Sequence, residues 1–196
     1  VELYGTEEQK RKYLTPITTG EAIMGSAITE PDAGSDVAAI ATEAKRDGAD
    51  YIINGNKIFI TNGTVASYFN VICLTNPENP SRHRKHSVIL VESDREGFEA
   101  TKLHHKLGIR ASDTAELYFK DVRVPKENLI GEEGKGFYQF MEFFNITRIH
   151  VGAEAIGIAQ GAMEKSIAHA KSRTQFGKTL SSFQATQFKI CLLYTS

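Results

Sequence analysis

The sequence contains little that would mark a membrane-spanning, secreted or nucleic-acid-binding protein. Its longest apolar runs, such as Val88–Val91, are only as long as a strand, whereas crossing a membrane as a helix takes about 20 residues. The two cysteines, Cys73 and Cys191, are too few for a disulfide framework or a four-ligand zinc site. The formal net charge is −1, and no basic stripe runs through aromatic-rich segments, which excludes the usual signature of a nucleic-acid partner.

These shortages predict a soluble protein with no membrane span, no bound metal and no nucleic-acid partner. Few cysteines fit a reducing compartment, so we expect a cytoplasmic location, or the mitochondrial matrix if the source is eukaryotic. The chain has 196 residues, of which 41% are hydrophobic and 24% charged. That composition is ordinary for a globular protein, and the length suffices for one large domain or two small ones.

The two ends of the sequence differ from the ends expected of a complete protein. The first residue is Val1 rather than methionine, no signal peptide is visible, and Gly5–Leu14 reads like the middle of a domain. Residues Cys191–Ser196 break the polar–apolar rhythm of the preceding helix and resemble the translation of a common DNA-library adapter. We therefore expect the native start to be missing and the native sequence to end near Ile190.

The hydrophobic pattern divides the chain into zones that together predict an α+β fold. Residues 1–20 are expected to close an N-terminal helical domain, since Thr6 can cap a helix and acidic residues follow at once. Residues 21–128 contain short strands with polar turns, which is typical of an antiparallel barrel or sandwich. Residues 129–190 are expected to start a C-terminal helical bundle, and residues 191–196 form the suspected non-native tail.

The strongest strand signal is a hairpin predicted over Tyr51–Thr61. Its centre, Asn54-Gly55, tolerates the positive φ angles that a tight turn needs, and β-branched residues flank it. Further strands are expected at Ile23–Thr29, Val37–Arg46, Asn70–Thr75, Ser87–Glu92 and Glu116–Val124.

A long helix is predicted after the flexible segment Gly131–Gly136, extending to about Arg173. Four apolar residues recur at helical spacing and form one stripe, and Gly177 is the expected stop. The four residues of the stripe are Phe137, Phe140, Met141 and Phe144.

The segment Ile28–Asp36 has the composition of a ligand-binding turn. Pro31 forces a turn after a strand, and small residues allow a ligand to approach the backbone. The hydroxyls of Thr29 and Ser35 and the amides around Gly34 could hold an anionic or heteroaromatic ligand. An ordinary Pro-Asx-Gly connection explains the same residues equally well.

A second candidate lies on the strand that contains Phe59 and Thr61. Strand alternation places these two side chains on one face and Ile58 and Ile60 on the other. An aromatic ring beside a hydroxyl suits a flat cofactor, because the ring packs against its plane while the hydroxyl bonds its heteroatoms. Taken alone, a half-buried strand end is the simpler interpretation.

Together the two segments closely resemble the acyl-CoA dehydrogenase family. Its flavin-side motif is present as Ala27–Asp36, and its second flavin element as Phe59–Gly63. The resemblance covers nearly all of the chain up to Ile190, and many blocks in the right order make it specific. The further blocks are Lys106–Thr114, Val122–Asn128, Gly157–Ala162 and Arg173–Lys178.

The resemblance implies FAD as the cofactor and assigns its contacts residue by residue. Thr29 would contact the flavin ring, Phe59 would lie against it where many relatives have tryptophan, and Thr61 would bond near N5. The expected contacts from the same subunit are Ser26, Ile28, Thr29, Ser35, Phe59, Ile60 and Thr61. The contacts expected to reach the flavin of a neighbouring subunit are Arg173, Gln175, Phe176 and Gln184, although Arg173 could equally serve as a favourable cation at a helix C-terminus.

The resemblance also implies an acyl-CoA substrate, with Ser35, Asn145 and Arg148 as its expected contacts. Relatives usually carry aspartate at the position of Asn145. Thr147 stands where isovaleryl- and long-chain-type relatives carry their catalytic glutamate. No residue of this chain is therefore named as catalytic.

Other charged residues offer weaker candidates. Arg82–His86 is a basic loop that could be merely solvated or could contact CoA phosphates. The histidines at positions 83, 86, 104 and 105 do not form a convincing metal site.

The function that the resemblance implies is FAD-dependent α,β-dehydrogenation of an acyl-CoA thioester. Electrons would pass to an electron-transfer flavoprotein, and the full-length protein would form a homo-oligomer, either a dimer or a tetramer. Two alternatives remain: an acyl-CoA oxidase or flavin monooxygenase on the same fold, and a non-catalytic acyl-CoA-binding relative.

By itself the 196-residue chain is expected to be inactive, because the family usually carries its catalytic base in later helices. The measurement is flavin absorbance during anaerobic addition of acyl-CoA thioesters to this chain. Bleaching by any of them would contradict the expectation.

Overall fold

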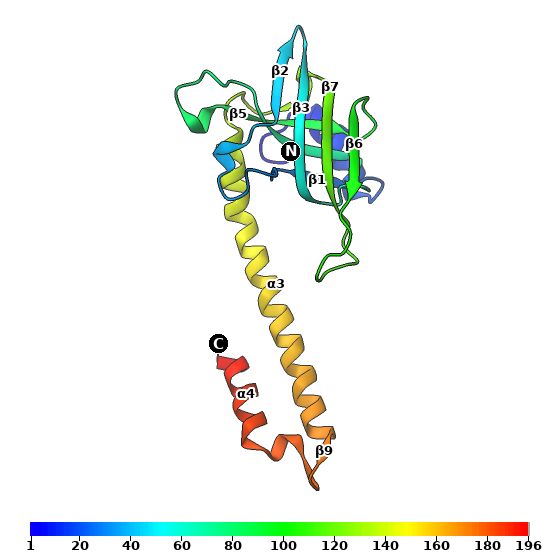
Figure 1. Ribbon diagram of the computed structural model, residues 1–196, viewed down its shortest axis with the longest axis vertical. Coiled ribbons are helices and arrows are strands. Elements are labelled where there is room, and N and C mark those ends of the chain that lie inside the picture. Colours follow the sequence, from blue (N-terminus) through cyan, green and yellow to red (C-terminus); the bar gives the residue numbers. More distant parts are fainter. Residues whose placement is uncertain (196) are drawn as a thin grey trace. The chain divides into compact units, whose positions relative to one another are not determined.

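The computed structural model describes residues 1–195, and contacts divide the chain into two compact units that meet between Met141 and Glu142. The first unit holds a short helical segment and a sheet, and the second is helical (Figure 1). The predicted α+β class is confirmed. No helix within residues 1–195 is both long enough and apolar enough to cross a membrane.

The helical segment begins where the sequence predicts it. The Thr6 hydroxyl accepts the amide of Gln9 at 3.1 Å, and the Gln9 side chain accepts the amide of Thr6 at 3.0 Å, which is a complete capping box. The Gln9 amide also donates to the carbonyls of Glu127 and Leu129, at 2.7 and 2.8 Å, so it joins the segment to the sheet. The elements are α1 Glu7–Gln9, the π-helical turn η1 Lys10–Leu14 and α2 Thr15–Thr18.

The first unit contains an eight-stranded sheet with the order β6-β7-β3-β2-β4-β5-β8, and β1 pairs with β4. Most pairings are antiparallel, as predicted for this zone, but β1 and β2 each run parallel to β4. The strands are β1 Met24–Ala27, β2 Glu43–Asp47, β3 Asp50–Thr61, β4 Tyr68–Leu74, β5 His86–Glu92, β6 Phe98–Lys102, β7 Thr114–Pro125 and β8 Leu129–Ile130.

The predicted hairpin over Tyr51–Thr61 is wrong, because β3 is one continuous strand. The chain reverses earlier, at Gly48, where φ is +62° and Asp47 pairs with Asp50. Asn54-Gly55 instead lies opposite a bulge whose extra residue is in β7, and a Cβ on Gly55, where φ is +147°, would lie 2.6 Å from the Thr42 hydroxyl oxygen. The positive φ that this dipeptide tolerates therefore serves a bulge rather than a turn.

The other strand predictions are mostly confirmed, with one error. The expected strand Val37–Arg46 is in fact the 3₁₀ turn η2 Val37–Ala39 followed by β2. The short strands β6 and β8 have no counterpart among the sequence predictions. Two further 3₁₀ turns are η3 Arg82–Arg84 and η4 Lys126–Asn128.

The inward faces of β1 to β5 and β7 form one hydrophobic core. Its residues come from positions that alternate along each strand, as a half-buried sheet requires. The aromatic rings of Phe69, Phe98 and Phe119 meet within it at centroid distances of 5.3 and 5.4 Å. Fully buried members include Ile53, Val71, Ile89, Leu117 and Val122.

The long periodic segment of the sequence forms the main helix of the second unit. Helix α3 spans Gly136–Ser172, close to the predicted limits, and Phe140 of the predicted stripe is buried. Gly177 does not stop this helix but lies, with φ +74°, in the turn of a small hairpin. The remaining elements are β9 Thr174–Gln175, β10 Lys178–Thr179, the 3₁₀ turn η5 Leu180–Ser182 and α4 Gln184–Thr195.

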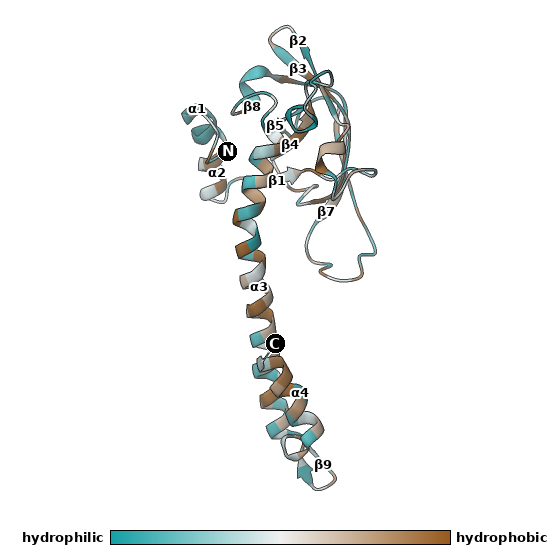
Figure 2. Cartoon of the chain, turned by 90° about the vertical axis from the view of Figure 1, so that its left-hand side faces the viewer, coloured by the Kyte–Doolittle hydropathy of each residue, from teal (hydrophilic) through white to brown (hydrophobic). Residues whose placement is uncertain are grey.

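Hydrophobic residues recur along α3 and α4 (Figure 2). Several of them are exposed in this chain, among them Ile149, Val151, Ile156, Phe188 and Leu192. Helix α4 continues through the suspected adapter-derived residues to Thr195, so secondary structure does not separate that tail, and its origin stays a prediction.

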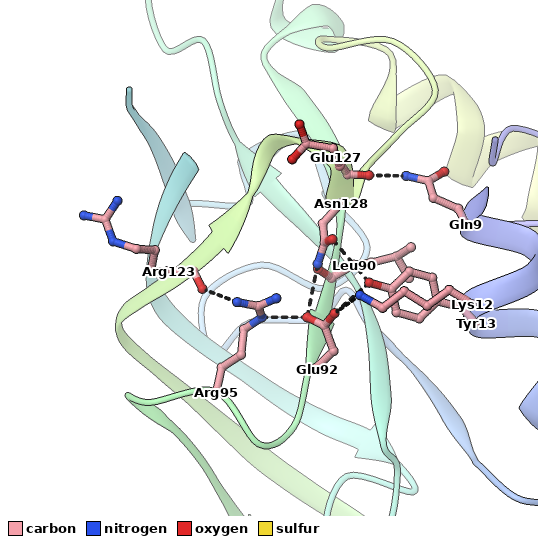
Figure 3. A network of polar contacts seen from close by, with 9 residues as sticks. All are labelled: Gln9, Lys12, Tyr13, Leu90, Glu92, Arg95, Arg123, Glu127 and Asn128. Carbon is pink, nitrogen blue, oxygen red and sulfur yellow. Dashed lines mark hydrogen bonds and ion pairs between the residues drawn. The ribbon is translucent and has the colours of Figure 1, made fainter. Parts of the chain in front are cut away.

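Glu92 is the centre of the polar network that fastens the helical segment to the sheet (Figure 3). Its carboxylate accepts the Tyr13 hydroxyl at 2.7 Å, the Lys12 ammonium at 2.9 Å, the Arg95 guanidinium at 2.6 Å and the Asn128 amide at 3.1 Å. Burial alone would raise the pKa of this carboxyl, but the bonds from Arg95, Tyr13 and Lys12 outweigh burial and lower the pKa to about 2.

Glu92→Gln is expected to lower the free energy of unfolding by about 1–3 kcal/mol near neutral pH, because it removes the charge from bonds to a partly buried carboxylate. A carboxyl whose folded pKa is lowered stabilises the fold above its unfolded pKa and loses that contribution as pH falls. The difference from the wild-type chain should therefore shrink as pH falls from ordinary glutamate values towards about 2. Urea unfolding of both chains across this range provides the measurement. The matched control is Glu99→Gln, at an exposed position of β6, and an equal loss there would contradict the assignment.

Candidate functional site

The predicted ligand-binding turn lies directly beside β3. Two main-chain bonds close it: the Glu30 amide donates to the Ala33 carbonyl at 2.9 Å, and the Ala33 amide donates to the Glu30 carbonyl at 3.2 Å. The Ile58 amide then donates to the Thr29 carbonyl at 2.9 Å, which joins the turn to the strand. The two candidate segments, remote in sequence, therefore meet at one place.

A bulge in β3 itself determines which side chains this place exposes. Lys57 pairs with Leu117 and Ile60 with Ala115, so β3 has one extra residue here. Phe59 takes a φ of +60° at this bulge and its side chain is 66% exposed, whereas Ile60 is only 3% exposed. Phe59 and Thr61 thus share the exposed face, as predicted. The side chain of Ile60 points into the core, so only its main chain remains available to a ligand.

Strand β1 passes next to Thr61. A Cβ on Gly25 would lie 3.3 Å from the Thr61 carbonyl oxygen and 2.7 Å from the ring of Phe69, so only glycine permits this approach. The neighbouring Ser26 is exposed, and Ile28 and Thr29 are half-buried. The structure therefore brings six of the predicted flavin contacts together in the first unit: Ser26, Ile28, Thr29, Phe59, Ile60 and Thr61.

The loop after Thr61 is held from the far side by Asp113. The Asp113 carboxylate accepts the amide and the hydroxyl of Thr64 at 2.8 and 2.9 Å, and its carbonyl accepts the Asn62 amide at 3.0 Å. Burial opposes ionisation, but the two bonds from Thr64 and the Lys102 ammonium keep the pKa of this carboxyl below its ordinary value. Asp113 thereby fixes the backbone at the end of the exposed strand.

A buried ion pair under the turn was missed from the sequence. The Lys57 ammonium lies 2.9 Å from the Glu30 carboxylate and also donates to the Ile28 carbonyl at 3.0 Å. The Lys57 side chain has no exposed surface, and that of Glu30 is 8% exposed. Strand alternation alone places Lys57 on the face of Phe59 and Thr61, and only the bulge between Lys57 and Ile60, which the sequence does not reveal, separates its buried side chain from theirs.

Ser35 and Asp36 are exposed at the end of the turn. Asp36 forms an ion pair with Arg82, so the basic loop adjoins the turn. In that loop the His83 ring stacks on Phe137 at 4.4 Å, and His86 is buried with its Nε2 2.9 Å from the Ile40 carbonyl oxygen. Among residues 1–195 no three metal-ligating side chains gather in one place.

The remaining predicted contacts lie in the second unit. The Arg148 guanidinium donates to the Asn145 amide oxygen at 2.6 Å, and both residues are exposed. Arg173, Gln175 and Phe176 lie in and beside the β9–β10 hairpin, where Phe176 is 92% exposed with a φ of +53°. Gln184 is the first residue of α4. The hairpin therefore presents an aromatic ring and polar side chains to solvent.

The residues of the first unit fit a flavin. An exposed ring at Phe59 can cover a flat heteroaromatic group, and exposed hydroxyls at Ser26, Ser35 and Thr61 can bond its polar atoms and a phosphate. The close approach at Gly25, on the buried side of β1, lets β1 lie against β3 beside this exposed face.

Phe59→Asn is expected to change the free energy of unfolding by less than about 1 kcal/mol, because the ring is exposed and asparagine tolerates positive φ. Ile60→Ala, one residue further on, should cost about 2–4 kcal/mol because it opens a cavity in the core. Urea unfolding of the two variants provides the measurement. Equal losses would show that the Phe59 ring is packed in the fold and is not held ready for a ligand.

Comparison with known proteins identifies the family. Residues 25–122 match the model of the acyl-CoA dehydrogenase middle domain, and residues 134–196 match that of the acyl-CoA dehydrogenase C-terminal domain. The short-chain specific acyl-CoA dehydrogenase of Clostridium acetobutylicum is 47% identical over 181 residues, which are 92% of this chain and 47% of that protein.

Solved structures agree with the sequence matches. The acyl-CoA dehydrogenase of Geobacillus kaustophilus superposes with a TM-score of 0.96 at 46% identity, over 99% of this chain and 51% of that one. A glutaryl-CoA dehydrogenase of Mycobacterium smegmatis, solved in complex with FADH2, superposes with a TM-score of 0.90 at 38% identity, over 97% of this chain and 47% of that one. This chain thus spans about half the length of the relatives it matches. The chain belongs to the acyl-CoA dehydrogenase family of flavin-dependent oxidoreductases.

Proposed function

We propose that the protein containing this chain is an FAD-dependent acyl-CoA dehydrogenase that introduces an α,β double bond into an acyl-CoA thioester and passes the electrons to an electron-transfer flavoprotein. One observation carries the proposal: the Thr29 turn and the Phe59–Thr61 segment are joined side by side and expose a ring and hydroxyls. They do so in a unit that matches the middle domain of this family.

The flavin-side residues have separate tasks under this proposal. Phe59 covers one face of the ring system and excludes water from it. The hydroxyls of Thr29 and Thr61 fix its orientation by hydrogen bonds, and Ser26 and Ser35 bond more distant polar atoms. When bound, FAD supplies the acceptor for the hydride that leaves the β carbon of the substrate.

The substrate side rests on Ser35, Asn145 and Arg148. Arg148 is held by its bond to Asn145 at 2.6 Å and keeps further donors for an acyl-CoA oxygen. Thr147 does not replace a carboxylate base, because a hydroxyl does not ionise near neutral pH, and this one donates its proton to the Phe144 carbonyl at 3.2 Å. The base that takes the α proton is not assigned to a residue of this chain.

The second unit supports a role in a homo-oligomer. The hairpin with Gln175 carries the Phe176 ring, which is 92% exposed, and Arg173 and Gln184 are exposed near it in the sequence. These four residues would complete the flavin site of a neighbouring subunit in a dimer or tetramer. The exposed apolar side chains of α3 and α4 are consistent with burial in such an assembly.

Anaerobic addition of acyl-CoA thioesters of increasing length to the purified flavoprotein tests the proposal. Bleaching of the flavin, reversed by an electron-transfer flavoprotein, is the expected result, and the chain length with the fastest bleaching identifies the substrate. Absence of bleaching with all of them would contradict dehydrogenation. Rapid peroxide formation in air would indicate an oxidase instead.

Thr61→Val should weaken FAD binding about two- to tenfold, since it removes one hydrogen bond from a water-poor site. Thr101→Val is the matched control, because Thr101 is an exposed strand threonine on β6. Dissociation constants measured by flavin fluorescence distinguish the two, and equal values would remove Thr61 from the site.

A further inference from the structure

Among the lysines of residues 1–141, Lys57 alone has a fully buried side chain. Burying a charged ammonium is costly unless it is paired and hydrogen-bonded. Replacing a buried ion pair by apolar residues of similar size is often neutral or stabilising. The stability of the fold therefore does not by itself explain why a lysine and a glutamate occupy these positions.

The ion pair joins three segments of the chain. The Lys57 ammonium bonds the Ile28 carbonyl and the Glu30 carboxylate, at 3.0 and 2.9 Å. The same carboxylate accepts the main-chain amides of Ala41 and Thr42 at 2.7 and 2.8 Å. The flavin-side turn, the segment leading into β2, and β3 are thus fixed to one another through two side chains.

The titratable groups beside the ion pair, Cys73 and His86, favour their neutral forms. Burial raises the pKa of the Cys73 thiol to about 12, so Cys73 stays neutral. Burial lowers the pKa of His86, whose ring bonds the Ile40 carbonyl. Burial opposes ionisation of both partners and lowers the pKa of Lys57, whereas Lys57 and the amides of Thr42 and Ala41 keep the pKa of the Glu30 carboxyl below the ordinary value.

The same lysine bears on the orientation of Phe59. In a regular strand, residues 57 and 60 would face opposite sides. Here Lys57 and Ile60 are both buried, and the bulge between them takes up the extra residue. Glu30 holds Lys57 inward, and Ile60 also faces inward. Both positions are possible only if Phe59 is directed outward, at its φ of +60°.

We propose that Lys57 and Glu30 are positioning residues for the flavin: their buried ion pair sets the distance between the Thr29 turn and the Phe59–Thr61 segment, and thereby the affinity for FAD. This inference rests on the proposed function. Neither side chain is assigned a contact with the flavin, since both lie beneath the exposed segments.

The first experiment needs no flavin and measures hydrogen exchange of the chain itself. In Lys57→Met, the amides of Glu30, Ala33 and Ile58 should exchange at least about tenfold faster, because the bonds that close the turn and join it to β3 open locally. The amides of Val71 and Ile89, in β4 and β5, should keep their wild-type rates. Unchanged exchange at Ile58 would overturn the proposal.

The second experiment measures the dissociation constant and the absorption spectrum of FAD in the full protein. Lys57→Met and the milder Glu30→Gln should each weaken FAD binding at least about tenfold, because the turn and the strand that contact FAD are no longer held in one fixed arrangement. The double variant should lose less FAD affinity than the sum of the two single losses in binding free energy, because either change alone already breaks the pair. Additive effects would contradict the coupling.

Two controls separate positioning from general destabilisation. Lys45→Met removes an exposed lysine from β2 and should leave FAD affinity within about twofold of the wild type. Ile53→Val lowers stability through the core and should also leave the affinity and flavin spectrum unchanged. If the wild-type protein binds FAD and Lys57→Met binds it equally well, the positioning role is wrong. If the wild-type protein itself binds no FAD, the proposed function fails first.

Discussion

The Lys57–Glu30 ion pair lies beneath both exposed segments of the candidate site, and the arrangement of those segments depends on it. Lys57 has no exposed surface, and Glu30 accepts main-chain amides as well as the ammonium. The low polarity of the surroundings makes each of these bonds strong and makes the loss of either partner costly. The pair therefore acts as a local constraint that keeps a turn and a strand in one fixed relation.

Strand β3 carries the exposed side chains that can bind a ligand. It pairs with β2 on one side and β7 on the other, so its position in the sheet is fixed along most of its length. Its bulge interrupts the alternation between Lys57 and Ile60, and the consequence is an exposed Phe59 beside an exposed Thr61. A residue other than glycine at positive φ is unfavourable in itself. Such strain at this position is consistent with a ring held ready for a cofactor.

The sequence predicted those features that depend on neighbouring residues, and it failed where distant residues decide. The limits of α3 and the Thr6 cap follow from local periodicity and capping chemistry, and the structure has both. Asn54-Gly55 was assigned to a turn because positive φ is needed in turns and in bulges alike, and only pairing with β7 distinguishes the two. The Lys57–Glu30 pair joins residues that are 27 positions apart, so no local pattern reveals it. The exposed aromatic and hydroxyl groups were recognised because they belong to motifs of the family.

The central claim is that FAD binds to the exposed segments of the first unit, above the buried Lys57–Glu30 pair. The most direct measurement is a crystal structure of the full protein with FAD bound. The account predicts that the isoalloxazine ring lies against Phe59 with the hydroxyls of Thr29 and Thr61 at hydrogen-bonding distance, about 3 Å, and with the Lys57–Glu30 pair intact below. Density for FAD elsewhere on the chain, or an isoalloxazine ring that contacts neither threonine, would contradict it.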